Sequence, residues 1–284
     1  MFSTQRIFPI ACKASGMVID NRYQLLPELG IKKRNYSTLY KAKDKETTRW
    51  VTVKFTEAEK TPELFATHKR KWYLISHPNL LSCLNLFELT VDLGEGEKKY
   101  STVVNEYLDG APISHHYIKF EDRKFCKQAV SEILSGLDFL HRLGLVHRDV
   151  KCSNIFFYNR EKGGLGIKLT DLVMLGEEGE APVHFVGTPE YTAPEVFRKE
   201  KLNCKSDYWS LGCVLYEIFT RGSLPFGTRL DVGGLEELKE RIMNQAYKMD
   251  KALSQKHILI LDQLLDKSIS TRLADSGKII GFFN

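Results

Sequence analysis

The chain has 284 residues, 43% of them hydrophobic, and a formal net charge of +5 at neutral pH. This composition can build an ordinary globular core, so it excludes a disordered or a fibrous protein. Basic residues cluster at 32–34 and 69–71. No aromatic residues are interleaved with them as stacking platforms for bases, so we predict no nucleic-acid binding.

The cysteines and the apolar stretches indicate a protein of a reducing compartment. The six cysteines lie far apart and form no Cys-x-x-Cys pair, which predicts reduced thiols and neither a disulfide framework nor a zinc site. No apolar stretch approaches membrane-spanning length, and the patch at 7–11 is short for a signal-peptide core. We therefore expect a cytoplasmic or nuclear protein without a membrane span, and a monomer by default.

The first third of the chain predicts strands with one helix. Residues 1–21 show no periodicity, and we interpret them as an N-terminal arm. The alternation in Trp50–Phe55 is typical of a half-buried strand. Thr61 and Pro62 suit the start of a helix. Two further strands, around 84–89 and 100–104, are joined by a polar, turn-rich link.

After residue 110 the pattern becomes helical. Apolar residues recur every three or four positions in two stretches, which predicts two helices that each bury one face, an apolar stripe. The stripes are Cys126, Val130, Ile133, Leu137 and Leu140, then Leu211, Val214, Leu215, Ile218 and Phe219. Between them, 155–158 and 167–170 flank Gly163 and Gly164 and predict a hairpin that brings Asn154 close to Asp171. Two or three more helices complete the chain.

One run of eight residues, His-Arg-Asp-Val-Lys-Cys-Ser-Asn at 147–154, carries the most specific chemical signal. Asp149 can accept a proton from a hydroxyl, Lys151 can neutralise a moving phosphate, and the amide oxygen of Asn154 can hold a metal ion. Charged residues in a turn after an amphipathic helix usually form a solvated loop. This spacing favours the chemical interpretation.

The run resembles the catalytic loop of eukaryotic protein kinases, and the resemblance extends from about Tyr23 to Phe283. The other supporting motifs follow in the family's order: Val-Thr-Val-Lys (51–54), His-Pro-Asn-Leu (77–80), Asn-Glu-Tyr-Leu (105–108), Asp-Leu-Val (171–173), Gly-Thr-Pro-Glu-Tyr-Thr-Ala-Pro-Glu (187–195) and Asp-Tyr-Trp-Ser-Leu-Gly (207–212).

The resemblance implies an α+β, two-lobed protein kinase fold, with a small, mostly antiparallel β lobe carrying one regulatory helix and a larger, mainly helical lobe. We place the kinase domain at 22–284, with the small lobe at about 22–105, the hinge at about 106–110 and the large lobe at about 111–284.

The same resemblance implies a serine/threonine protein kinase that uses ATP and Mg²⁺. Asp149 and Lys151 are the expected catalytic residues, and Asn154 and Asp171 the expected metal ligands. The ATP-binding set comprises Lys54, Gly30, Glu106, Leu108, Asn154 and Asp171. The expected partner is a protein substrate with a Ser or Thr acceptor, and a regulatory protein partner is left open.

Two further carboxylates have structural roles by the same resemblance. We expect Glu195 to pair with Arg272 and brace the large lobe. We expect Asp207 to fix the backbone of the catalytic loop. Both should be buried and partnered, because an unpaired buried carboxylate is costly.

Three positions depart from the family's pattern. Residues 29–40 contain a single glycine, Gly30, so the basic residues 32–34 either assist phosphate binding or form the tip of a plain hairpin. His68 stands where the family has the glutamate that pairs with Lys54, and we interpret it as a satisfied core residue. Val173 replaces a glycine, which predicts a less switchable metal site.

The segment from Leu172 to Val186 contains no Ser, Thr or Tyr. We therefore predict a kinase that needs no activation-loop phosphorylation. One of Glu177, Glu178 and Glu180 would pair permanently with Arg148, and the alternative is an exposed acidic loop without a partner.

The alternative function is a pseudokinase, a scaffold or allosteric partner with weak or no phosphotransfer. A small-molecule kinase is a third and weaker reading, because the segment 187–195 resembles a peptide-docking platform. Every residue expected to touch the reacting groups is present, which favours the enzyme.

Overall fold

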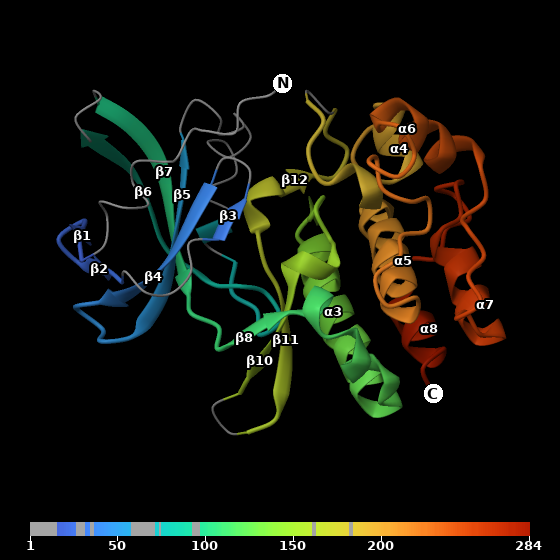
Figure 1. The fold of residues 1–284 in the computed structure, drawn as a ribbon, viewed down its shortest axis with the longest axis horizontal. Coiled ribbons are helices and arrows are strands. Elements are labelled where there is room, and N and C mark those ends of the chain that lie inside the picture. The colour runs from blue at the N-terminus through green and yellow to red at the C-terminus, as the bar shows by residue number, and fades with distance from the viewer. Residues whose placement is uncertain are drawn as a thin grey trace. The chain divides into compact units, whose positions relative to one another are not determined.

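The computed structural model describes residues 16–26, 32–34, 37–57, 72–73, 75–92, 97–160, 163–181 and 184–284 (Figure 1). The chain divides into two compact units. The first comprises Met1–Ser76 and Ser82–Tyr107, and the second comprises His77–Leu81 and Leu108–Asn284.

The first unit is built on a seven-stranded sheet in which every strand pair is antiparallel. Its order is β1-β2-β4-β5-β7-β6, and β3 pairs with β4. The strands are β1 (Val18–Ile19), β2 (Tyr23–Leu25), β3 (Lys32–Arg34), β4 (Ser37–Asp44), β5 (Trp50–Glu57), β6 (Cys83–Asp92) and β7 (Glu97–Glu106).

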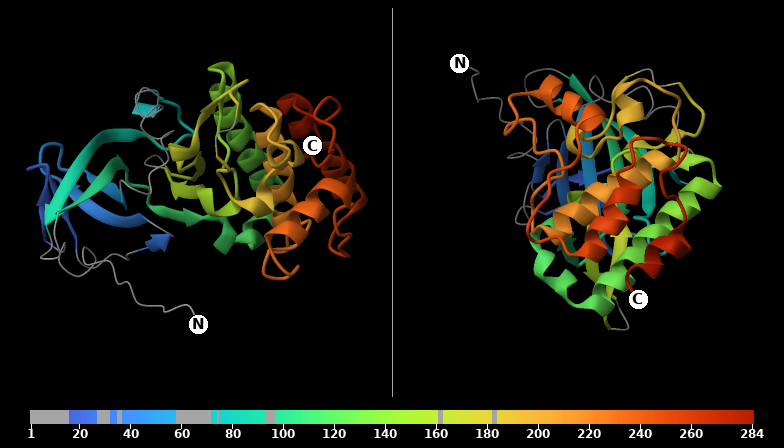
Figure 2. Two further views of the ribbon diagram at one scale, coloured as in Figure 1. Left: turned by 90° about the horizontal axis from the view of Figure 1, so that it is seen from above. Right: turned by 90° about the vertical axis from the view of Figure 1, so that its right-hand side faces the viewer.

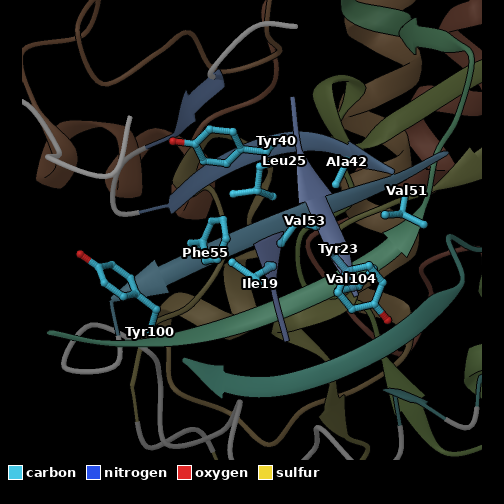
Figure 3. Close-up of a cluster of buried hydrophobic side chains, with 10 residues drawn as sticks. All are labelled: Ile19, Tyr23, Leu25, Tyr40, Ala42, Val51, Val53, Phe55, Tyr100 and Val104. Carbon is cyan, nitrogen blue, oxygen red and sulfur yellow. The ribbon is translucent and has the colours of Figure 1, made fainter. Parts of the chain in front are cut away.

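One face of this sheet forms the core of the unit, shown in Figure 3. Val51, Val53 and Phe55 of β5 are buried, as the alternating pattern predicted. The ring of Phe55 meets that of Tyr40 edge to face, with centroids 5.7 Å apart. Because side chains alternate along a strand, Lys54 lies on the opposite face. The helix expected from Thr61 lies outside the described residues.

The second unit combines helices with short strands. The helices are α3 (Arg123–Arg142), α4 (Pro194–Phe197), α5 (Lys205–Phe219), α6 (Leu235–Asn244), α7 (Gln255–Leu264) and α8 (Ser276–Gly281). The strands are β8 (Gly110–Pro112), β9 (Leu145–Val146), β10 (Ile155–Asn159), β11 (Leu165–Leu169) and β12 (Gly176–Glu177), arranged as β11-β10-β8 and β12-β9. In Figures 1 and 2, α5 lies between α3 and α7.

Helix α3 begins where Asp122 accepts the Phe125 amide at 2.9 Å, an N-cap that satisfies one otherwise unpaired donor. Its predicted stripe is buried throughout. Helix α5 differs from its prediction, since every residue from Ser206 to Ile218 is buried. The prediction placed only one face of α5 in the core. In the structure, neighbouring elements cover the helix on all sides, so the other faces are buried too.

The architecture confirms the α+β class, with an antiparallel sheet in one unit and a mainly helical second unit. The cysteines in the described part of the chain carry free thiols, as predicted: Cys83, Cys126, Cys152, Cys204 and Cys213. Within the same ranges, no helix combines the length and apolarity needed to cross a membrane.

Candidate active site

The loop that carries Asp149 is held in place by a carboxylate from α5. Asp207 is fully buried and accepts the amides of His147 at 2.8 Å and Arg148 at 3.0 Å. Its Oδ2 also lies 2.8 Å from Nε2 of His141. Burial alone would raise the pKa of Asp207, but the contacts with His141 and His147 outweigh it and lower the pKa. Asp207 therefore fixes the loop backbone, as predicted.

Two residues of this region adopt a backbone conformation that favours glycine. Arg148 has a φ of 70° and Asp171 a φ of 63°. A left-handed conformation at a non-glycine residue costs about 1–3 kcal/mol and persists where the surroundings enforce it, often at functional sites. The strain falls beside Asp149 and on the predicted metal ligand.

Asp149 is the centre of a polar cluster. It is buried, with 6% of its own surface exposed. Nζ of Lys151 lies 2.8 Å from its Oδ2, and the Thr188 hydroxyl donates to its Oδ1 at 2.7 Å. Nδ2 of Asn154 donates to Oδ2 at 2.7 Å and to the Asp149 carbonyl at 2.9 Å. Lys151 also donates to the Thr188 hydroxyl at 2.5 Å. The structure thus brings three predicted site residues, Asp149, Lys151 and Asn154, into contact, and adds Thr188, which was not predicted.

Thr188 is not among the predicted site residues, although it lies in the motif at 187–195 that supports the resemblance. It reaches Asp149 because Gly187 packs closely on the catalytic loop. Gly187 has a φ of 104°, and a Cβ at this position would lie 2.5 Å from the Arg148 carbonyl oxygen. Only glycine fits this approach without displacing backbone.

The hairpin of β10 and β11 brings the two predicted metal ligands close together. Thr170, which precedes Asp171, donates its amide to the Asn154 carbonyl at 2.8 Å and its hydroxyl to the same oxygen at 3.0 Å. The structure confirms the predicted hairpin and the prediction that it brings Asn154 close to Asp171.

The donor set suits Mg²⁺. Nδ2 of Asn154 donates to Asp149, so the remaining polar atom of this amide is the oxygen Oδ1, and Asp171 has two carboxylate oxygens. Mg²⁺ prefers such hard oxygens and usually keeps water and phosphate ligands, so one or two protein ligands suffice. The described residues contain no group of three or more His, Cys, Asp or Glu able to cage a metal.

The other described nucleotide contacts of the prediction, Lys54, Glu106 and Leu108, are divided between the two units. Lys54 lies on β5, opposite Leu39 of β4 and Val103 of β7. Glu106 ends β7, and its Oε1 accepts the Ser82 amide at 2.8 Å, so its carboxylate joins the end of β7 to the residue that precedes β6. Leu108 begins the longer segment of the second unit. Gly30 and His68 lie outside the described residues.

The predicted brace between Glu195 and Arg272 is confirmed. Both side chains are buried, and two hydrogen bonds of 2.6 and 2.8 Å join the guanidinium to the carboxylate. The Ser206 hydroxyl adds a bond of 2.7 Å to Oε1 of Glu195. Burial would raise the pKa of Glu195, but Arg272 outweighs it and holds the pKa below the usual range.

The acidic residues of the activation segment have different contacts. Glu178 accepts the Cys204 amide at 3.2 Å where α5 begins, and Glu180 accepts the Glu177 amide at 3.2 Å. Burial lowers the pKa of Arg148, and the negative charges of Glu180 and Asp207 oppose that shift. Of the three acids predicted to pair with Arg148, Glu180 is the one whose charge is near enough to raise the pKa of Arg148.

Val173 lies in a short 3-10 helix, Leu172–Met174, directly after Asp171. The positive-φ residues of the described chain include Asp171 but not Val173. The valine therefore fits this conformation without the backbone strain that only a glycine would relieve.

The comparisons with known proteins agree with the two-unit fold and the loop at 147–154. The family described as "Protein kinase domain" matches residues 23–278. This chain belongs to the protein kinase family.

The curated relatives are protein kinases by name, and two of the three described below are named serine/threonine kinases. A RAC family serine/threonine-protein kinase homolog of Dictyostelium discoideum is 30% identical over 223 residues, which cover 75% of this chain and 47% of the relative. The serine/threonine-protein kinase cds1 of Schizosaccharomyces pombe is 25% identical over 277 residues, 90% of this chain and 57% of the relative. CBL-interacting protein kinase 26 of Oryza sativa subsp. japonica is 29% identical over 272 residues, 90% of this chain and 51% of the relative. The chain spans about half the length of these relatives.

Proposed function

We propose that this protein is an active serine/threonine kinase that transfers the γ-phosphate of Mg-ATP to protein hydroxyls. The observation that carries the proposal is the cluster around Asp149. A buried carboxylate here holds a threonine hydroxyl at 2.7 Å and a lysine ammonium at 2.8 Å. A carboxylate that already accepts one hydroxyl and lies beside a cation is suited to orient an acceptor hydroxyl of a substrate and take its proton.

In the proposed reaction each group of the chain has a defined task. Asp149 orients the acceptor hydroxyl and takes its proton as that oxygen bonds to phosphorus and the bond to the β-phosphate oxygen breaks. Lys151 balances negative charge on the transferred group. Asn154 and Asp171 would hold Mg²⁺, which supplies charge neutralisation between the phosphates. Lys54, Gly30, Glu106 and Leu108 would bind the nucleotide.

We further propose that no phosphorylation of the activation segment is needed. Two observations support this: residues 172–186 contain no Ser, Thr or Tyr, and the negative charge of Glu180 raises the pKa of Arg148 against the effect of burial. A phosphate near Arg148 would also be negatively charged, but it would be present only after phosphorylation, whereas the Glu180 carboxylate is permanent.

The second candidate is a pseudokinase. It is favoured by three sequence positions, the glycine-poor segment 29–40, His68 and Val173. The 3-10 conformation of Val173 weakens one of these arguments, since the valine is accommodated without strain.

The test is transfer of radiolabelled phosphate from Mg-ATP to a basic protein substrate, followed by phosphoamino-acid analysis. The proposal predicts phosphoserine and phosphothreonine. Absence of transfer by folded protein would favour the pseudokinase. An ATP-dependent rise in melting temperature would then show that nucleotide still binds.

A further inference from the structure

The antiparallel sheet of the first unit carries a buried amide whose oxygen has no hydrogen-bond donor. Asn105 of β7 is 5% exposed, and its Oδ1 is buried and accepts no hydrogen bond within the described part of the chain. A buried oxygen of this kind is costly, because nothing compensates for the loss of its contact with water. The oxygen therefore needs a donor that the described residues do not supply.

The neighbours of Asn105 across the sheet have donors, but these donors are bonded elsewhere. Thr52 of β5 and Cys83 of β6 lie directly opposite Asn105. The Thr52 hydroxyl donates to the Glu106 carbonyl at 3.3 Å, and the Cys83 thiol donates to the Asn85 carbonyl at 3.5 Å. Neither adjacent strand therefore satisfies the amide from the position that faces it.

Asn105 lies on the face of the sheet that carries Lys54. Figure 3 shows Val53 and Val104 in the core on one face. Because side chains alternate along a strand, Lys54 and Asn105 lie on the opposite face. Lys54 is opposite Val103, and Asn105 is two residues further along β7, a separation of about 7 Å. A nucleotide whose phosphates lie at Lys54 can therefore present its base to Asn105.

The side-chain amide of asparagine is complementary to one edge of adenine. The N6 amino group of adenine donates and N7 accepts, and asparagine recognises adenine in DNA by two hydrogen bonds to this edge. Guanine has acceptors at both places, O6 and N7, so one of them would face the amide oxygen without a proton between them. In the common anti conformation of a nucleotide, this edge lies on the side of the 5′-phosphates, which is the side of Lys54.

We propose that Asn105 selects adenine as the base of the bound nucleotide. Its Oδ1 accepts from the N6 amino group, and its Nδ2 donates to N7. The amide turns about its terminal torsion to face the base, and this torsion has broad preferences. This role rests on the proposed function, because it takes the nucleotide to be ATP held by Lys54. Lys54 then fixes the phosphates and Asn105 fixes the base.

Calorimetric titration of the full chain with Mg-nucleotides, in the absence of a protein substrate, tests the proposal. 7-Deaza-ATP keeps the shape and the amino group of ATP but lacks the N7 acceptor. The parent should bind ATP about three- to tenfold more tightly than 7-deaza-ATP, the range of one hydrogen bond, and at least about tenfold more tightly than GTP. In Asn105→Leu, which has a similar volume and no polar atom, ATP and 7-deaza-ATP should bind within about twofold of each other.

Two further measurements separate this role from a structural one. Thr52→Val removes a polar atom opposite Asn105 whose hydrogen bond is already made within the protein. Its preference for ATP over 7-deaza-ATP should stay within about twofold of the parent's. Without nucleotide, Asn105→Leu should melt no lower than the parent, because apolar atoms replace an unpaired buried oxygen.

Equal affinities of the parent for ATP and 7-deaza-ATP would overturn the proposal, as would a preference that persists in Asn105→Leu. A lower melting temperature of nucleotide-free Asn105→Leu would assign Asn105 a structural role instead. Should that variant misfold, the parent's own preference between the two nucleotides keeps the test decisive. Phosphotransfer without a preference for ATP would refute this inference alone, whereas absence of nucleotide binding to folded protein would also refute the nucleotide site of the proposed function.

Discussion

Replacing Arg272 with leucine should destabilise the second unit strongly. The substitution removes the two hydrogen bonds of 2.6 and 2.8 Å to Glu195 and the two that the guanidinium donates to the main-chain oxygens of Asp266 and Lys205. It leaves the buried Glu195 carboxylate with the Ser206 hydroxyl as its described partner. Breaking a buried ion pair in this way costs about 3–5 kcal/mol of unfolding free energy. For a unit of this size, that loss lowers the melting temperature by roughly 6–20 °C.

The chain offers an exposed Arg–Glu pair as a control. Nε of Arg198 lies 2.6 Å from Oε1 of Glu200, but these side chains are 42% and 45% exposed. Arg198→Leu should therefore cost at most about 1 kcal/mol. Urea unfolding of both variants gives the free energies, and the slope against urea checks that the unfolded states are comparable.

A double variant isolates the pair itself. Arg272→Leu combined with Glu195→Leu removes the orphaned charge, so it should be more stable than Arg272→Leu alone. The reasoning fails if Arg272→Leu costs less than about 1 kcal/mol, or if adding Glu195→Leu destabilises the protein further.

Three further predictions concern pH, activation and metal. The pKa of Glu195 lies below its ordinary value of about 4.3, so its stabilisation is complete above that pH and is lost as the pH falls through the lowered pKa. Acid unfolding should show this loss in the parent and much less in Arg272→Leu. Glu180→Ala should slow phosphotransfer several-fold, while Glu178→Ala leaves the rate within about twofold, and equal rates for the two variants would contradict the account. Asp171→Asn should abolish the Mg²⁺-dependent part of ATP stabilisation in thermal melts; a retained Mg²⁺ dependence would exclude Asp171 as a ligand.

The local part of the site could be predicted from the sequence. Asp149, Lys151 and Asn154 lie within eight residues, so their spacing constrains their geometry directly. The hairpin that joins Asn154 to Asp171 followed from two apolar runs around a glycine pair. The resemblance to a known family supplied the pairing of Glu195 with its distant partner, which no local pattern reveals.

The remaining contacts depend on tertiary packing and leave little periodic signal. Thr188 reaches Asp149 across 39 residues only because Gly187 allows two backbones to approach closely. Tyr117 meets Glu217 across 100 residues. Neither contact follows from the spacing of apolar residues, which reports burial within one element and not the partner across the core.

The most direct test of the central claim is the single-turnover rate of phosphoryl transfer in the parent and in Asp149→Asn. Both proteins should first be shown to melt cooperatively and to bind Mg-ATP with affinities within about threefold. If Asp149 is the base, the rate falls at least about 100-fold in the variant, the usual contribution of a positioned acid–base group. An equal rate in the two proteins would show that the cluster around Asp149 does not carry out the reaction.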